Sequence, residues 1–169
     1  MLGSLIRRLS ICVSGEEQGL FMAISFQHGI DLPQSPHEVF TLLADYSKVP
    51  LWLKRCEGVA KQSSGPNKVG DKLRYAYCES GRHGLMDGVI TAYDEDRHMA
   101  YRYYDKMMQV VVEFRMEPNG EGTHLTHHID ITPHSFMAKL MSPIFRMKLP
   151  KQTMQTTENI RVLLAREAA

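Results

Sequence analysis

A run of short segments in which apolar and polar residues alternate, followed by one long helical segment, constrains this fold most. The alternating segments are residues 54–62, 71–80, 83–94, 98–105, 109–117 and 122–132. Alternation with a period of two residues is typical of strands with one buried face. The turns between them are rich in Gly, Asn and Asp and recur at hairpin-like intervals, which indicates antiparallel pairing. The middle of the chain is therefore predicted to form a continuous antiparallel meander.

A further strand and two short helices are predicted ahead of the meander. Residues 23–30 alternate in the same way and are expected to form the first strand. Ser35 and Pro36 then supply an N-cap and a proline in the first turn, which predicts a helix over residues 36–45. A second short helix, interrupted by a proline, is expected over residues 46–53.

The C-terminal segment, residues 135–166, has the apolar spacing of a long helix. Its apolar residues are Met137, Leu140, Met141, Ile144, Met147, Ile160, Leu163 and Leu164. Because prolines at 143 and 150 disrupt helix hydrogen bonding, we expect a short leading helix or a kink near Pro150. The predicted class is α+β, a curved antiparallel sheet of about seven strands wrapped around a long C-terminal helix.

Composition and charge indicate an ordinary soluble domain. The chain has 169 residues, is 43% hydrophobic and carries a formal charge of +1, so no global field would recruit nucleic acid. Cys12, Cys56 and Cys78 lie in no CxxC or CxxH spacing, which argues against disulfides and structural zinc and favours a cytoplasmic protein. We expect residues 1–21 to be a disordered extension and residues 22–166 to be one domain.

The sequence contains no motif for a nucleotide cofactor or an activated nucleophile. Walker, GxGxxG, HExxH and GxSxG patterns are all absent. His124, His127 and His128 are close in sequence, but on a strand His127 faces away from the other two. A metal site with three histidine ligands is therefore not expected, and neither is a cofactor.

Several short motifs occur in a fixed order along the chain. They are Leu32-Pro33 followed by PHEVFTLLAD at 36–45, Trp52, VGD at 69–71, ITAYD at 90–94 leading into 97–101, and GTHL at 122–125. Over about residues 22–166 this order resembles the START-like helix-grip (SRPBCC) superfamily. The branch it resembles is that of polyketide cyclase/dehydrase and lipid transport, which also includes coenzyme Q-binding proteins. The resemblance implies the helix-grip fold, whereas the activities of the family are too varied to transfer directly.

Strand parity predicts which side chains face the space between sheet and helix. The sheet and short-helix residues predicted to contact a ligand are Trp52, Leu73, Tyr75, Tyr77, Met86, Ile90, Met99, Tyr101, Tyr103, Val112, Phe114, Leu125, His127 and Ile129. From the long helix they are Leu140, Met141, Ile144, Met147 and Met154. Apolar walls with a few polar groups are typical of small-molecule pockets. The alternative is that these residues simply fill a core.

Two hypotheses place function in this space. The first is noncatalytic binding or carriage of a small lipid-like or polycyclic aromatic ligand, which the residues favour. The second is a cyclase or dehydratase without metal or nucleotide cofactor, in which His127 acts on the substrate together with Tyr75, Tyr77 or Glu79. Burial between apolar neighbours is expected to lower the pKa of His127 and keep it neutral.

A third hypothesis is a protein-interaction module with an exposed patch around Trp52, Met107 and Met108. At most a transient membrane contact is expected, at the basic start of the long helical region. The cations there are Lys139, Arg146, Lys148 and Lys151. A small hydrophobic ligand is the expected partner, and the protein is expected to be a monomer or a homodimer.

Overall fold

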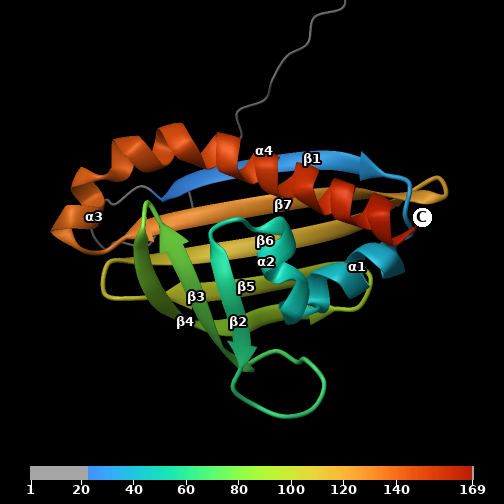
Figure 1. Ribbon diagram of the computed structural model, residues 1–169, viewed down its shortest axis with the longest axis horizontal. Helices are drawn as coiled ribbons and strands as arrows, with labels where there is room; N and C mark the ends of the chain where they lie inside the picture. Colours follow the sequence, from blue (N-terminus) through green and yellow to red (C-terminus); the bar gives the residue numbers. More distant parts are fainter. Residues whose placement is uncertain (1–22, 169) are drawn as a thin grey trace, which may run out of the picture.

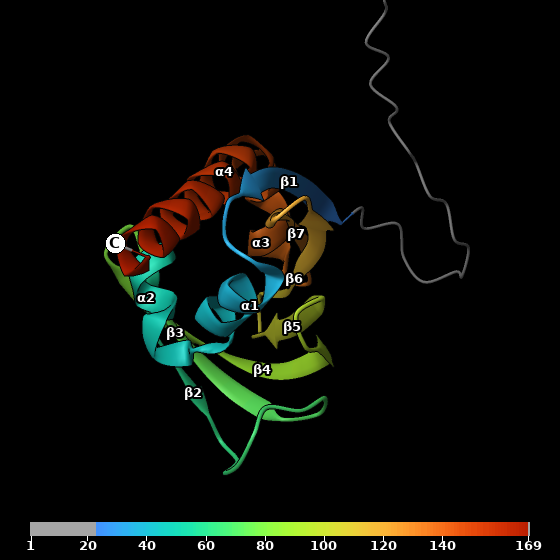
Figure 2. The ribbon, with the colours of Figure 1, turned by 90° about the vertical axis from the view of Figure 1, so that its right-hand side faces the viewer.

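The computed structural model describes residues 23–168, in which a seven-stranded antiparallel sheet curls around the short helices that follow the first strand and the long C-terminal helix (Figures 1 and 2). The strand order is β1-β7-β6-β5-β4-β3-β2, so β1 and β2 form the two edges. The strands are β1 (Ile24–Leu32), β2 (Cys56–Lys61), β3 (Lys72–Glu79), β4 (Arg82–Asp94), β5 (His98–Tyr104), β6 (Met108–Asn119) and β7 (Gly122–Pro133). The helical elements are α1 (Pro36–Ala44), η1 (Tyr46–Lys48), α2 (Val49–Trp52), α3 (Phe136–Leu140) and α4 (Ser142–Glu167).

The predicted fold class is confirmed, including the meander and the short helices after the first strand. The start of α1 follows the predicted signal. Ser35 Oγ accepts a hydrogen bond from the Glu38 backbone N–H at 3.4 Å, and the Ser35 N–H donates to Glu38 Oε2 at 2.8 Å. This reciprocal capping box, with Pro36 in the first turn, satisfies amides that a helix start otherwise leaves without partners. The predicted extension, residues 1–21, lies outside the described residues.

The C-terminal region has the predicted short leading helix, α3, and then a helix, α4, that continues through Pro150. The side of α4 that faces the sheet includes the expected Ile160 and Leu164 in the carboxyl half but differs from the expected one in the amino half. Its buried residues are Leu149, Thr153, Thr156, Thr157, Ile160 and Leu164. The threonine hydroxyls donate to backbone carbonyls one turn earlier, so they need no partner from the sheet. Among residues 23–168, no helix is long and apolar enough to cross a membrane.

Helix α4 lies along β1 and β7 and reaches α2, so that it covers one side of the open sheet (Figures 1 and 2). Its carboxyl half belongs to the main core cluster, in which Ile160 and Leu164 join Trp52 and Phe114. Asn159 Nδ2 also donates to the Trp52 carbonyl at 2.9 Å, which ties α4 to α2. The interior is therefore bounded by the curved sheet, the short helices and α4.

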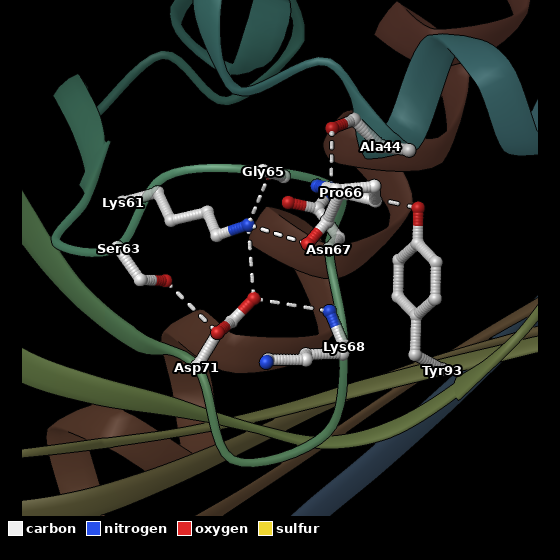
Figure 3. A network of polar contacts seen from close by, with 9 residues as sticks. All are labelled: Ala44, Lys61, Ser63, Gly65, Pro66, Asn67, Lys68, Asp71 and Tyr93. Atoms are coloured by element: carbon white, nitrogen blue, oxygen red, sulfur yellow. Dashed lines mark hydrogen bonds and ion pairs between the residues drawn. The ribbon is translucent and has the colours of Figure 1, made fainter.

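The loop between β2 and β3 is held by a buried carboxylate (Figure 3). Asp71 accepts hydrogen bonds from Lys61 Nζ at 2.9 Å, Ser63 Oγ at 2.9 Å and the Lys68 backbone N–H at 3.0 Å. The bond from the Lys61 ammonium, with smaller help from Ser63 and Lys68, lowers the pKa of Asp71 and keeps it ionised. The VGD motif therefore fixes the loop between β2 and β3.

Candidate ligand-binding site

Four tyrosines cover the inner face of β3 and β5, and we call them the tyrosine row: Tyr75, Tyr77, Tyr101 and Tyr103. Ring centroids lie 5.8 Å apart for Tyr75 and Tyr77, 5.2 Å for Tyr75 and Tyr103, and 6.2 Å for Tyr101 and Tyr103. These separations are those of favourable aromatic pairs. Alternate residues of a strand share one face, and β4 lies between β3 and β5, so both strands bring their rings to the same side of the sheet, over β4.

Two glycines of β4 let these rings lie close to the backbone. A Cβ atom at Gly84 would come within 2.4 Å of the Tyr77 ring, and one at Gly88 would come within 2.5 Å of the Tyr103 ring. Such distances are too short for a side chain, so both positions require glycine unless the rings move. Sequence reasoning missed this feature, although two glycines four residues apart on one strand face are its visible signal.

The centre of the inner face is incompletely covered. Tyr75, Tyr77, Tyr103, Val110 and Val112 are only half-buried, although they lie on the concave side beneath the helices. The inner face nearer α1 is, in contrast, fully buried in the main core cluster. The sheet and α4 are therefore packed tightly at one end and leave accessible surface in the middle.

Polar side chains connect α4 to the β2–β3 side of this space, and we call them the polar bridge: Arg55, Glu79, Lys148 and Gln152. Arg55 Nη1 donates to Gln152 Oε1 at 3.1 Å and lies 4.0 Å from Glu79 Oε2. Lys148 Nζ lies 3.9 Å from Glu79 Oε1. Burial raises the pKa of Tyr75, and the charge of the nearby Arg55 opposes that rise. The bridge thus places a guanidinium beside the tyrosine row.

His127 lies on the inner face of β7 and is 2% exposed. Its ring stacks on Phe114 with centroids 4.4 Å apart, and Trp52 meets Phe114 edge-on at 5.9 Å. Within residues 23–168, neither His127 Nδ1 nor Trp52 Nε1 has a hydrogen-bond partner, although both atoms are buried. Burial, followed by the positive charge of Arg55, lowers the pKa of His127 to about 3. The predicted lowering is confirmed, and the imidazole is neutral at physiological pH.

The structure separates the predicted ligand contacts into three groups. Fully buried are Trp52, Leu73, Met86, Ile90, Met99, Tyr101, Phe114, Leu125, His127 and Ile129. Half-buried are Tyr75, Tyr77, Tyr103 and Val112. The predicted helix residues are exposed: Leu140, Met141, Ile144, Met147 and Met154. The expectation that this apolar stripe faces the interior is wrong, because another stripe of the same helical region, which includes Ala138, Leu149, Thr153 and Ile160, packs on the sheet.

Two of the exposed methionines border a separate open groove of about 570 Å³ between α4 and β1. Met147 and Met154 line it from α4, and His28 and Ile30 line it from β1. Sequence reasoning did not anticipate this groove, because it depends on where α4 meets the edge strand.

The other predicted features are placed as follows. Glu79 is at the end of β3 with its side chain 40% exposed, in the polar bridge. His127 has no hydrogen bond to Glu79, Tyr75 or Tyr77 among the residues that the structure describes. Trp52 is 5% exposed, so the expected exposed patch around it is not formed.

Two clusters outside the interior could hold a metal ion. Glu57, Cys78 and His83 lie together on the outer side of β2, β3 and β4. His37 meets Glu95 and Asp96 where α1 approaches the β4–β5 turn. In each cluster one ligating atom of every residue lies within 4.8 Å of the others. The predicted separation of the β7 histidines is also present, since His127 faces inward while His124 bonds Asp31 at 2.7 Å on the outside.

Comparison with protein families gives a match over residues 23–152 to the family described as polyketide cyclase / dehydrase and lipid transport. The chain belongs to this family. The resemblance found in the sequence is thereby confirmed. No curated protein sequence matches the chain.

Solved structures with the same fold are similar at low sequence identity. The Zhui aromatase/cyclase from Streptomyces sp. R1128 has 14% identity and a TM-score of 0.72, over 88% of this chain and 97% of that one. The di-domain ARO/CYC StfQ from the steffimycin biosynthetic pathway has 13% identity and a TM-score of 0.70, over 86% and 52%. A START superfamily protein from Mycobacterium smegmatis has 12% identity and a TM-score of 0.66, over 84% and 97%. At these identities the likeness establishes the shared fold.

Proposed function

We propose that this member of the polyketide cyclase/dehydrase and lipid-transport family binds and carries a small hydrophobic molecule between the inner face of its sheet and α4. The observation that carries the proposal is the half-buried centre of that face, at Tyr75, Tyr103 and Val112. In a solid core such residues would be fully buried, because protein interiors are close-packed. The fold and family also support a hydrophobic ligand.

The chemistry of the walls narrows the class of ligand. The tyrosine row offers flat rings that suit a lipid-like chain or a polycyclic aromatic system. Trp52 Nε1 is a buried donor that finds no acceptor within residues 23–168, and Arg55 is a cation at the edge of the row. Buried polar groups are rarely left unpaired, so a carbonyl or hydroxyl oxygen on the ligand would complete the site.

Carriage is better supported than catalysis. A general base works best when its pKa is near the working pH, and the pKa of His127 is about 3. Burial also raises the pKa of the Tyr103 hydroxyl. These groups are therefore suited to orienting a neutral ligand rather than to exchanging protons in a cyclisation or dehydration.

Filling the proposed space with a larger side chain tests the proposal. Val112→Phe adds bulk on the inner face, and Val111→Phe adds the same bulk on the outer face of the same strand, where it serves as the matched control. We expect Val112→Phe to weaken binding of the fluorescent probe 1-anilinonaphthalene-8-sulfonate by about tenfold or more, because about 1.4 kcal/mol of lost contact changes Kd tenfold. Val111→Phe should leave the Kd unchanged. Native mass spectrometry of the purified protein would identify a co-purified ligand.

Chemical unfolding supplies a second measurement on the same variants. Overfilling a packed core costs about 1–3 kcal/mol, whereas a phenylalanine placed in open space costs little. Two results together would contradict the proposal: a large loss of stability in Val112→Phe, and equal probe binding by the unchanged protein, Val112→Phe and Val111→Phe. The interior would then be a solid core.

A further inference from the structure

The helices α3 and early α4 expose several large apolar side chains, which we call the apolar helix surface. Phe136 is 79% exposed, Met147 74%, Leu140 65% and Met137 57%, and the remaining members are Met141 and Ile144. In Figure 1 these two helical segments lie together at the end of the molecule away from α1. Exposed apolar patches of this kind on a folded protein mark interaction sites.

The apolar helix surface is held in place by the adjoining β5–β6 turn. The backbone N–H groups of His134 and Ser135 donate to the Met107 carbonyl at 2.8 and 3.0 Å. Ser135 also caps α3, since its Oγ accepts from the Ala138 N–H at 3.1 Å. Met107 itself is 37% exposed beside these helices. The exposed apolar side chains are therefore presented by a fixed backbone.

The segment that carries this surface has charges of one sign, although Glu79 of β3 lies 3.9 Å from its Lys148. Residues 131–157 contain no Asp or Glu, while Lys139, Arg146, Lys148 and Lys151 contribute four positive charges to a chain whose net charge is only +1. The rest of the chain is therefore net negative. Cations interleaved with exposed apolar residues on a helix are the pattern of segments that lie in the interface of an anionic bilayer.

We propose that α3 and the first turns of α4 dock onto the surface of a membrane that contains anionic lipid. Apolar side chains would enter the interface between headgroups and acyl chains, and the cations would contact the headgroups. A second copy of the chain fits less well, because a symmetric contact would bring like charges together. Met147 belongs to both the apolar helix surface and the groove between α4 and β1, so docking would bring that groove to the bilayer.

Vesicle cosedimentation of the full chain tests the proposal. We expect binding about tenfold or more tighter to phosphatidylcholine vesicles that contain phosphatidylserine than to phosphatidylcholine alone. Added salt should weaken binding, because it screens the headgroup charge. The double variant Phe136→Ser/Leu140→Ser should lose binding to both kinds of vesicle, and Arg146→Gln/Lys151→Gln should lose only the preference for anionic lipid.

Leu85→Ser is the matched control, because Leu85 on β4 is 60% exposed and lies outside the apolar helix surface. It should bind vesicles as the unchanged protein does. Equal binding to both kinds of vesicle, no binding to either, or unchanged binding of Phe136→Ser/Leu140→Ser would overturn the proposal. So would a dimer, seen by sedimentation velocity, that Leu140→Ser dissociates. Binding of the fluorescent probe in the interior is measured without lipid. The proposal of a docking surface and the proposal of a ligand site are therefore tested independently.

Discussion

The two halves of the C-terminal helical region have similar apolar spacing but opposite surroundings. In the amino half, Leu140 and Met147 project outward among lysines and arginines. In the carboxyl half, Ile160 and Leu164 are buried against Trp52 and Phe114. The comparison shows that helical periodicity predicts a helix and an apolar stripe, but the surface that packs on the sheet is chosen by the shape and position of the sheet.

The largest expected effect is a difference in the free energy of unfolding between substitutions in the two halves. Ile160→Ala should lower the free energy of unfolding by about 2–5 kcal/mol, because it removes buried methyl groups from a side chain that is 0% exposed and leaves a cavity. Leu140→Ala, in the exposed half, should change it by no more than about 0.5 kcal/mol. Urea unfolding of both variants measures the difference, and equal losses would mean that both halves are buried.

A smaller effect is the pH dependence of stability that comes from His127, which is buried in the interior with Phe114 and Trp52. The pKa of His127 is about 3 in the folded protein, against 6.5 for an unperturbed histidine, so the unfolded chain takes up the proton first as pH falls. The contribution of neutral His127 to the free energy of unfolding is fully present above pH 6.5 and decreases as the pH falls toward 3. By linkage, about 2 kcal/mol should be lost between about pH 7 and pH 5.

His127→Gln should lack this loss when urea unfolding is compared at about pH 7 and pH 5. His134→Gln provides the control, because His134 is exposed at the end of β7. If unchanged protein and His127→Gln showed the same slope of stability with pH, then His127 would be solvated in the folded state.

The smallest expected effect is at the far end of α4. Lys48 Nζ donates to Glu167 Oε1 at 2.7 Å, with side chains 32% and 40% exposed. Exposed ion pairs contribute about 0–1 kcal/mol, so a double-mutant cycle with Lys48→Met and Glu167→Gln should give a coupling of about 0.5 kcal/mol or less. A coupling above about 2 kcal/mol would show that this pair, rather than the buried face, anchors the carboxyl half.

Most of the fold could be predicted because its signals are local. Ser35, Pro36 and Glu38 specify the start of α1 within a few residues, and Ser80-Gly81 gives the positive φ angles of the tight β3–β4 turn. Alternation likewise predicts which residues of β3 and β5 share a face. These signals depend on the backbone geometry of a few consecutive residues. They therefore do not require contacts between distant parts of the chain.

The candidate site was only partly predictable because its contacts join distant segments. The inward direction of Tyr75 and Tyr103 follows from parity, but the close approach of Tyr103 to Gly88 depends on strand register. The contact of Arg55 with Gln152 joins segments far apart in the sequence and leaves no local pattern.

Local sequence was enough to specify the strands, the turns, the helix starts and the low pKa expected of a histidine between apolar neighbours. These follow from dihedral preferences, period and burial. The side of α4 that packs inward was settled only by tertiary packing, which leaves Met147 and Met154 at the surface and Thr153 and Ile160 inside. The physical reason is that both sides of the helix are compatible with burial, and the curvature of the sheet selects one of them.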